Sequence, residues 1–144
     1  MCTFQRRRYF TADACVQMVR EHLLQTASEQ AAEITAYCFM PDHLHVLAEG
    51  STETADLISL ATMFRNRSGT TYRRRSGGRL WQEGYFDRVL RNSEATYDVV
   101  RYIIANPVRA GLCHEAASYP YSGSSRYSLD DLTASVHWEP RSLG

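Results

Sequence analysis

The chain has 144 residues, 44% hydrophobic and 22% charged, with a formal net charge of zero at pH 7. That length suits a single domain over residues 1–144, and the composition is that of an ordinary globular protein. No run of about 18 apolar residues occurs, which excludes a transmembrane helix, and no apolar stretch follows the basic N-terminus as in a secretory signal. We therefore expect a cytoplasmic protein without a membrane partner.

The charges are unevenly distributed along the chain. All 16 basic residues are arginines, and residues 57–92 contain eight of them against Glu83 and Asp87, a local balance of +6. Arginine suits phosphate oxygens and stacks on bases, so the cluster predicts a face that binds a polyanion. A coding sequence of high GC content would explain why the basic residues are arginine and not lysine, but it would not explain why eight of them are clustered. The eight are Arg65, Arg67, Arg73, Arg74, Arg75, Arg79, Arg88 and Arg91.

The first half of the chain predicts a helix followed by a hairpin. Apolar residues at helical spacing indicate a helix from about Ala12 to Gln30. Residues 34–40 are rich in strand-forming types, Pro41-Asp42 is a turn signal, and residues 43–47 resume a strand pattern. The four scattered cysteines form no CxxC pair, so we interpret them as apolar fillers or free thiols.

The second half predicts two further helices. One runs from Ser51 to Arg67 with Thr54 as its N-cap, and the arginine- and glycine-rich residues 73–79 after it are expected to form a loop. The other begins at Ser93 and stops at Asn106-Pro107, because a residue before proline is disfavoured in a helix. Residues 113–144 are expected to be an irregular C-terminal tail. Strands mixed with helices in this order indicate an α+β fold, an antiparallel sheet with helices packed on it.

Two histidines in the second strand are candidate metal ligands. Side chains alternate along a strand, so His43 and His45 project from the same face. Two neutral imidazoles on one face can bind a divalent cation and leave positions open for a third ligand and a substrate oxygen. A surface or hydrogen-bonded histidine pair is the alternative, and an HxH triplet by itself does not decide between them.

The third predicted helix carries a candidate nucleophile. Tyr102 and Asn106 are one turn apart, on the border between the apolar and polar faces of this helix. A phenol there can attack a phosphodiester if a cation polarises the phosphate, and Asn106 can add an oxygen ligand to that cation. The alternative is a border tyrosine that only covers the core.

Three blocks of the sequence together resemble a known family. These are Tyr37–Leu47, which contains the histidine pair, Trp81–Asp87, and Tyr102–Leu112. Their order and spacing, over roughly Cys2 to Tyr121, resemble the REP-associated tyrosine transposases, a branch of the HUH-type single-tyrosine transposases. The chain departs from that family at Met1–Phe4, where relatives usually have a longer first strand. We therefore expect a missing or shortened first strand, which would either weaken the sheet or reflect a different start codon.

The resemblance implies a ferredoxin-like HUH endonuclease fold and cleavage of single-stranded DNA near hairpin-forming repeats. It implies Mg²⁺ or Mn²⁺ held by His43, His45 and Asn106, with Tyr102 as the nucleophile that leaves a 5′-phosphotyrosine and a free 3′-OH. The arginine cluster and Tyr85 would then bind the DNA, and the protein would act as a monomer or homodimer.

Two other functions remain open. The chain could be a catalytically silent DNA-binding protein of the same fold that acts at repeat sequences. It could also be an unrelated phosphoesterase that uses the histidines and a metal but takes water as its nucleophile. Formation of a covalent DNA adduct distinguishes both from a transposase.

Overall fold

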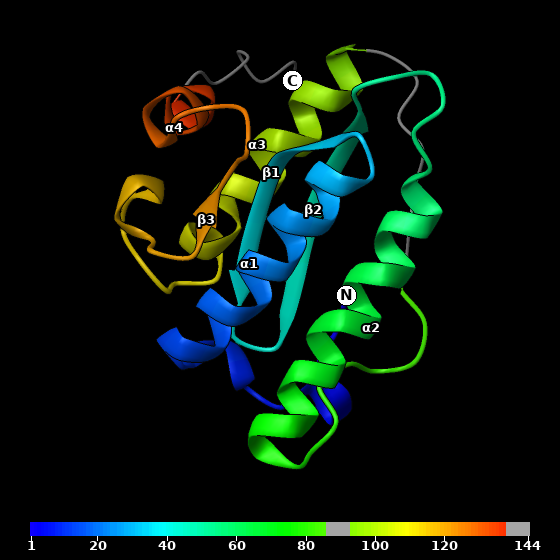
Figure 1. The fold of residues 1–144 in the computed structure, drawn as a ribbon. Helices are drawn as coiled ribbons and strands as arrows, with labels where there is room; N and C mark the ends of the chain where they lie inside the picture. The colour runs from blue at the N-terminus through cyan, green and yellow to red at the C-terminus, as the bar shows by residue number, and fades with distance from the viewer. Residues whose placement is uncertain (86–92, 138–144) are drawn as a thin grey trace.

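The structure, a computed structural model, describes residues 1–85 and 93–137. A three-stranded sheet lies at its centre and four α-helices pack around it (Figure 1). The helices are α1 (Asp13–Glu29), α2 (Leu57–Ser76), α3 (Ser93–Arg109) and α4 (Leu129–His137), and the strands are β1 (Ala32–Met40), β2 (His43–Gly50) and β3 (Ser122–Gly123). The predicted α+β class is therefore confirmed.

The sheet is built on the hairpin that the sequence predicted. Strands β1 and β2 pair antiparallel around the turn at Pro41-Asp42, and β3 pairs antiparallel with the other edge of β1, which gives the order β2-β1-β3. Beyond β2, Cys2 forms an isolated bridge with His43, and Thr3 forms one with Trp81. Cys2 and Thr3 thus pair only through single bridges, and within the described residues no strand of the sheet precedes β1.

Each face of the sheet packs on its own hydrophobic cluster. On one face Tyr37 and Phe39 of β1 pack with Val19 of α1 and Phe64 of α2, and on the other Cys38 and Met40 pack with α3 and α4. Figure 1 shows α1 in front of the hairpin and α3 behind it. Because side chains alternate along a strand, residues 43, 45 and 47 of β2 share the α3 face, whereas Leu44 is buried on the other. The alternation thus decides which helix the two histidines meet.

Helix α2 differs from its prediction at both ends. It begins after Asp56, whose carboxylate accepts a hydrogen bond from the backbone N–H of Ser59 at 3.0 Å, rather than after Thr54. It continues to Ser76, so residues 73–76, predicted to be a loop, form its last turn. Arginine is a good helix former, and Gly77 then ends the helix in the left-handed region at φ 78°.

Helix α3 passes through the proline that was expected to stop it. It ends at Arg109, with Pro107 in its last turn, fully buried. The prediction that Asn106-Pro107 ends the helix is therefore wrong. The helical hydrogen bonds continue past the proline, because the carbonyl of Asn106 accepts a hydrogen bond from the N–H of Ala110 at 2.9 Å. Gly111, at φ 75°, follows directly.

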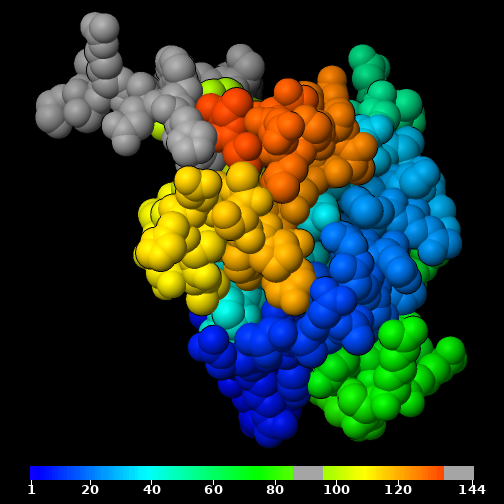
Figure 2. Space-filling model, turned by 90° about the vertical axis from the view of Figure 1, so that its left-hand side faces the viewer, coloured from blue at the N-terminus to red at the C-terminus, as the bar shows by residue number. Residues whose placement is uncertain are grey.

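Residues 114–137 contain regular elements where an irregular tail was expected, and residues 138–144 of that predicted tail lie outside the described residues. The described segment contains β3 and α4, and the backbone of Tyr121 accepts a hydrogen bond from the N–H of Phe39 at 2.9 Å. Figure 2 shows this segment (yellow to orange) lying above the N-terminal residues (blue) on one side of the molecule. Leu132 of α4 is buried against the α3 side of the sheet, which explains why the segment folds onto the domain. Within the described ranges, no helix is long and apolar enough to cross a membrane.

Candidate active site

The two histidines of β2 lie together on the face that α3 covers. His43 is opposite Met40 and His45 opposite Cys38 in the β1–β2 ladder, while Leu44 between them is buried on the other face. Their Nε2 atoms are 3.1 Å apart and their ring centroids 4.8 Å apart. The predicted pair on one strand face is present, with one nitrogen of each ring directed at the other.

Helix α3 places Tyr102 beside this pair. Val100, Ile103 and Ile104 are buried against the sheet, which leaves the Tyr102 side chain at the edge of the interface, 54% exposed. The Tyr102 ring meets the His45 ring edge-to-face, with centroids 5.7 Å apart. The structure therefore brings Tyr102 next to a histidine pair that lies more than 50 positions earlier in the sequence, with the tyrosine still open to solvent.

Arg109 belongs to the same cluster, and the sequence analysis did not single it out. Its guanidinium lies 4.3 Å above the centroid of the Tyr102 ring and donates a hydrogen bond of 2.6 Å to the Tyr102 carbonyl oxygen. The two residues also line a surface cavity of about 250 Å³ together with Asp98, Arg101 and Ala105. A spacing of seven residues puts Arg109 two turns after Tyr102 on one helix face, and that spacing was the available signal.

Asp42 is the second residue that the sequence analysis did not assign to the site, since it was interpreted only as a turn former. One of its carboxylate oxygens accepts a hydrogen bond from His43 Nδ1 at 2.7 Å, and the other lies 3.0 Å from Arg6 Nε. Burial raises the pKa of Asp42, but the bonds from His43 and Arg6 outweigh burial and hold that pKa below its usual value. Asp42 is therefore an ionised partner of His43 at neutral pH.

The electrostatic surroundings keep His45 neutral. Burial, and then the charge of His43, lower the pKa of His45 to about 4. A neutral imidazole keeps a lone pair on one ring nitrogen, which is the form that binds metal ions. His45 is therefore able to act as a metal ligand at neutral pH without first losing a proton.

The donor atoms fit a divalent cation in part. Metal–nitrogen bonds are about 2.0–2.1 Å long for a metal such as zinc, so two Nε2 atoms 3.1 Å apart can contact one ion. Among the residues the structure describes, no three His, Cys, Asp or Glu side chains form a metal-binding group, so a third protein ligand would have to be of another type. Asn106, partly buried one turn after Tyr102, carries such an oxygen, and its role remains a prediction.

Part of the predicted arginine cluster forms a groove along α2. A cavity of about 620 Å³ lies between this helix and the segment 79–85, and Arg65 stacks over Tyr85 at 5.2 Å. The backbone of Gln82 accepts a hydrogen bond from Arg65, and its N–H donates to Cys2, which bridges to His43. Cys2 thus connects the segment that lines the groove to β2. The residues of the predicted DNA-binding set that line it are Arg65, Arg73, Arg74, Arg79 and Tyr85.

The other predicted DNA-binding arginines do not line the groove. Arg67 points to α1, where it pairs with Glu29 at 2.5 Å and bonds to Thr26 at 3.2 Å. Arg75 is exposed in the last turn of α2, away from the groove lining. Arg88 and Arg91 lie outside the described residues. Arg67 thus contacts α1 and does not line the groove, whereas other arginines of the same helix do.

Comparison with known proteins shows which family the chain resembles. The family described as "Transposase IS200 like" matches residues 1–106. A REP-associated tyrosine transposase of Escherichia coli (strain K12) is 24% identical over 110 residues, which cover 74% of this chain and 62% of the relative. A putative REP-associated tyrosine transposase of Haemophilus influenzae is 29% identical over 129 residues, covering 80% and 69%. The match thus spans about three fifths of the E. coli protein.

A solved structure shares the fold. It is described as a REP-associated tyrosine transposase bound to a REP hairpin, and it superposes with a TM-score of 0.70 at 22% identity, covering 84% of this chain and 72% of the other. The match to the family over residues 1–106 includes His43, His45, Tyr102 and Asn106. Because that match covers well over half of its 144 residues, the chain belongs to the IS200-like transposase family.

Proposed function

We propose that this chain cleaves and rejoins single-stranded DNA beside hairpin-forming repeats, through a covalent bond between Tyr102 and the DNA. The contact between His45 and Tyr102, with ring centroids 5.7 Å apart, carries the proposal because it joins a candidate ligand to a candidate nucleophile. A tyrosine that only covered the core would have no need of this neighbour or of 54% exposure. The related structure bound to a REP hairpin supports hairpin DNA as the substrate.

The reaction is a transfer of a phosphoryl group from one oxygen to another. Tyr102 Oη forms a bond to the phosphorus while the bond from phosphorus to the 3′ oxygen breaks. The phenol loses its proton to solvent, and the departing 3′ oxygen takes one up. The products are a 5′-phosphotyrosine and a free 3′-OH, and because the linkage energy is conserved, a 3′-OH can attack in reverse and rejoin the strand.

His43, His45 and Asn106 would hold the metal, either Mg²⁺ or Mn²⁺. A divalent cation there supplies charge that polarises the phosphate oxygen and offsets the developing negative charge. The protein contributes a neutral His45, a His43 ring fixed by Asp42, and a tyrosine kept in place by packing of its neighbours on α3. These residues orient the nucleophile and the phosphate, which is where enzymes gain much of their rate.

The groove along α2 is the best candidate for binding the DNA backbone. Its four arginines carry positive charge, and Tyr85 offers a ring on which an unpaired base can stack. Because His45 and Tyr102 meet within one chain, we propose that the tyrosine serves its own histidines, whether the protein is a monomer or a homodimer.

A trapping experiment tests the proposal. The protein is incubated with Mn²⁺ and a labelled single-stranded oligonucleotide that carries a hairpin, and covalent adducts are resolved under denaturing conditions. We expect an adduct with the wild type that disappears in Tyr102→Phe. Tyr97→Phe is the matched control, because Tyr97 is also an exposed tyrosine of α3 (38%) and Arg101 lies over its ring at 5.9 Å.

The other outcomes favour the alternatives. DNA binding without an adduct in Mg²⁺ or Mn²⁺ would indicate a catalytically silent DNA-binding protein. Metal-dependent cleavage that survives Tyr102→Phe would indicate water as the nucleophile. Cis action is tested by mixing Tyr102→Phe with His45→Gln, and a return of adduct formation in the mixture would contradict it.

A further inference from the structure

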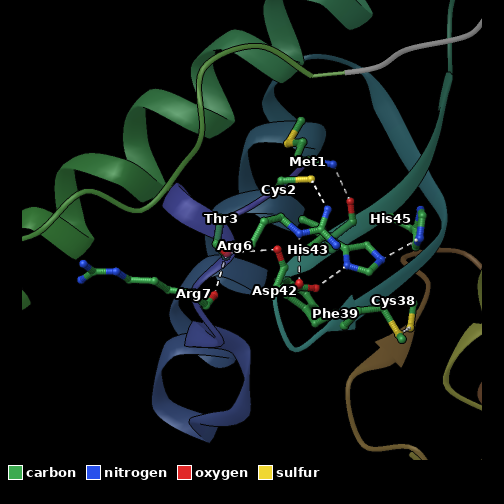
Figure 3. Close-up of polar contacts among 12 residues, drawn as sticks. Met1, Cys2, Thr3, Arg6, Arg7, Cys38, Phe39, Asp42, His43 and His45 are labelled. Carbon is green, nitrogen blue, oxygen red and sulfur yellow. Dashed lines mark hydrogen bonds and ion pairs between the residues drawn. The ribbon is translucent and has the colours of Figure 1, made fainter. Parts of the chain in front are cut away.

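Asp42 connects the histidine pair to an arginine outside the predicted site. Its Oδ1 accepts the bond from His43 Nδ1 at 2.7 Å and its Oδ2 accepts one from Arg6 Nε at 3.0 Å, so the carboxylate is held on both sides. Figure 3 shows Arg6, Asp42, His43 and His45 in one row, which ends at the Nε2–Nε2 contact of 3.1 Å. Four polar side chains from two separate segments thus form a continuous path.

The direction of these bonds determines which nitrogen of His43 is available. An ionised carboxylate only accepts hydrogen bonds, so His43 Nδ1 must carry a proton. In the neutral ring the lone pair is then on Nε2, the nitrogen that faces His45. Carboxylates that accept a hydrogen bond from a metal-binding histidine in this way fix its tautomer and ring orientation and increase its basicity.

The turn that carries Arg6 is built to reach Asp42. Gln5 and Arg6 have positive φ angles of 54° and 55°, which non-glycine residues rarely adopt. Thr3 stabilises this turn by donating from its hydroxyl to the carbonyls of Arg7 at 2.6 Å and of Asp42 at 3.0 Å. Backbone strain that the surroundings hold in place is a feature of functional sites. Here the strained residue is the one that contacts the carboxylate.

Stability alone is a weak explanation for this arrangement. The Arg6 side chain is 59% exposed and that of Asp42 26% exposed, and ion pairs at such positions contribute little to folding. An orienting role has no such limit, because it depends on the direction of the hydrogen bond and not on its net energy. The geometry therefore favours orientation of His43 over stabilisation of the fold.

We propose that Asp42, held by Arg6, is a positioning residue that keeps His43 in the tautomer and orientation that bind a divalent cation together with His45. This inference rests on the proposed function, since it assigns a role to the same metal site. It adds two residues, Asp42 and Arg6, that determine how one ligand is presented.

The first measurement is Mn²⁺ affinity, determined by titration calorimetry on the purified full chain without DNA. Asp42→Ala is expected to weaken Mn²⁺ binding about 10–100-fold, the usual effect of removing such a partner. Asp42→Asn keeps an oxygen that accepts from Nδ1, so it should restore much of the affinity. Arg6→Gln should weaken binding by a smaller factor, because the carboxylate is still present but is held on one side only.

The matched control is Arg7→Gln. Arg7 follows Arg6 in the same turn, and its guanidinium donates to Gln5 at 3.2 Å and not to Asp42. It changes charge and size as Arg6→Gln does, so we expect Mn²⁺ affinity equal to that of the wild type. An equal loss in both variants would show that only the general positive charge near the site matters and would overturn the role of Arg6.

The second measurement needs no metal. Nitrogen-15 NMR of the imidazole rings in the metal-free protein should show His43 protonated at Nδ1 and unprotonated at Nε2, and a mixture of tautomers in Asp42→Ala. Wild-type affinity and an unchanged tautomer in Asp42→Ala, with binding lost in His43→Gln, would overturn this inference alone. Unchanged Mn²⁺ binding in His43→Gln, or none in the wild type, would overturn the metal site itself and this inference with it.

Discussion

The guanidinium of Arg109 lies over the ring of Tyr102, 4.3 Å from its centroid, while the His45 ring of β2 meets the same ring edge-to-face. The Tyr102 ring thus contacts both an arginine of its own helix and a histidine of the sheet. A second bond, from Arg109 to the Tyr102 carbonyl, fixes the arginine in this place. The proposed nucleophile is therefore held by two neighbours although half of its side chain is exposed.

Replacing Arg109 is expected to slow adduct formation. Arg109→Ala removes the group that lies over the Tyr102 ring and the positive charge beside it. We therefore expect the rate of adduct formation to fall by up to roughly 10-fold. Arg109→Lys should recover part of that rate. Single-turnover kinetics with the hairpin oligonucleotide measure this. The control is Arg126→Ala, since Arg126 stacks over Tyr127 at 5.3 Å near the opposite end of β1. Equal slowing in both variants would contradict a specific role for Arg109.

The arginines of the α2 groove are expected to differ from Arg67 in DNA binding. Arg73→Ala and Arg74→Ala should each weaken binding and reduce the slope of log affinity against log salt by about 1, because each arginine would neutralise one phosphate. Arg67→Gln should leave the slope unchanged, since Arg67 pairs with Glu29 on the α1 side. Fluorescence anisotropy across a salt series measures both. Equal slopes for all three variants would show that the DNA does not follow the groove.

Trp81 is expected to support the fold rather than to stack on DNA. It is 5% exposed, packs with Phe10 and Phe64, and donates from Nε1 to Ser68 Oγ at 2.9 Å. Trp81→Ala should lower the free energy of unfolding by about 3–5 kcal/mol, as for other large core residues, and Trp81→Phe by about 1–2 kcal/mol through the lost hydrogen bond. Urea denaturation measures this. A normal stability combined with weak DNA binding would instead place Trp81 at the DNA.

The thiol of Cys38 is expected to be unreactive in the folded protein. Burial raises its pKa to about 11, so at pH 8 only about one molecule in a thousand carries the reactive thiolate. Alkylation with iodoacetamide should therefore leave Cys38 unlabelled at pH 8, modify it in denaturing urea, and label the partly exposed Cys2 first. The labelled fraction should increase as the pH rises toward the pKa. Rapid labelling of folded Cys38 at pH 8 would show that its burial is incomplete.

Local patterns in the sequence predicted much of the fold. The hairpin around Pro41-Asp42 and helix α1 follow from residue types and spacing that short-range physics decides. The end of α2 and the course of α3 do not follow from such local patterns. Arg73–Ser76 resembles a loop in composition but is also compatible with an exposed helix, and the choice depends on the αL cap at Gly77. Pro107 lies inside α3 and is fully buried, which the local preference of a residue before proline does not predict.

The candidate site, too, could be predicted from the sequence only in part. Alternation along β2 placed His43 and His45 on one face, and helical spacing placed Tyr102 one turn from Asn106, but neither pattern says that α3 lies over that face. This follows from packing of Val100 and Ile104 on the sheet. Arg6 is a further case, because its link to Asp42 depends on positive φ angles in a turn that no sequence pattern indicated.

The measurement that tests the central claim most directly is the identity of the residue that carries the DNA. The adduct formed with a hairpin oligonucleotide is digested with protease and nuclease, and the modified peptide is sequenced by mass spectrometry. The proposal predicts one nucleotide phosphate on Tyr102, joined through the 5′ phosphate, and none in His43→Gln or His45→Gln. A phosphate on Tyr97 or another tyrosine, or cleaved DNA with no modified peptide, would contradict it.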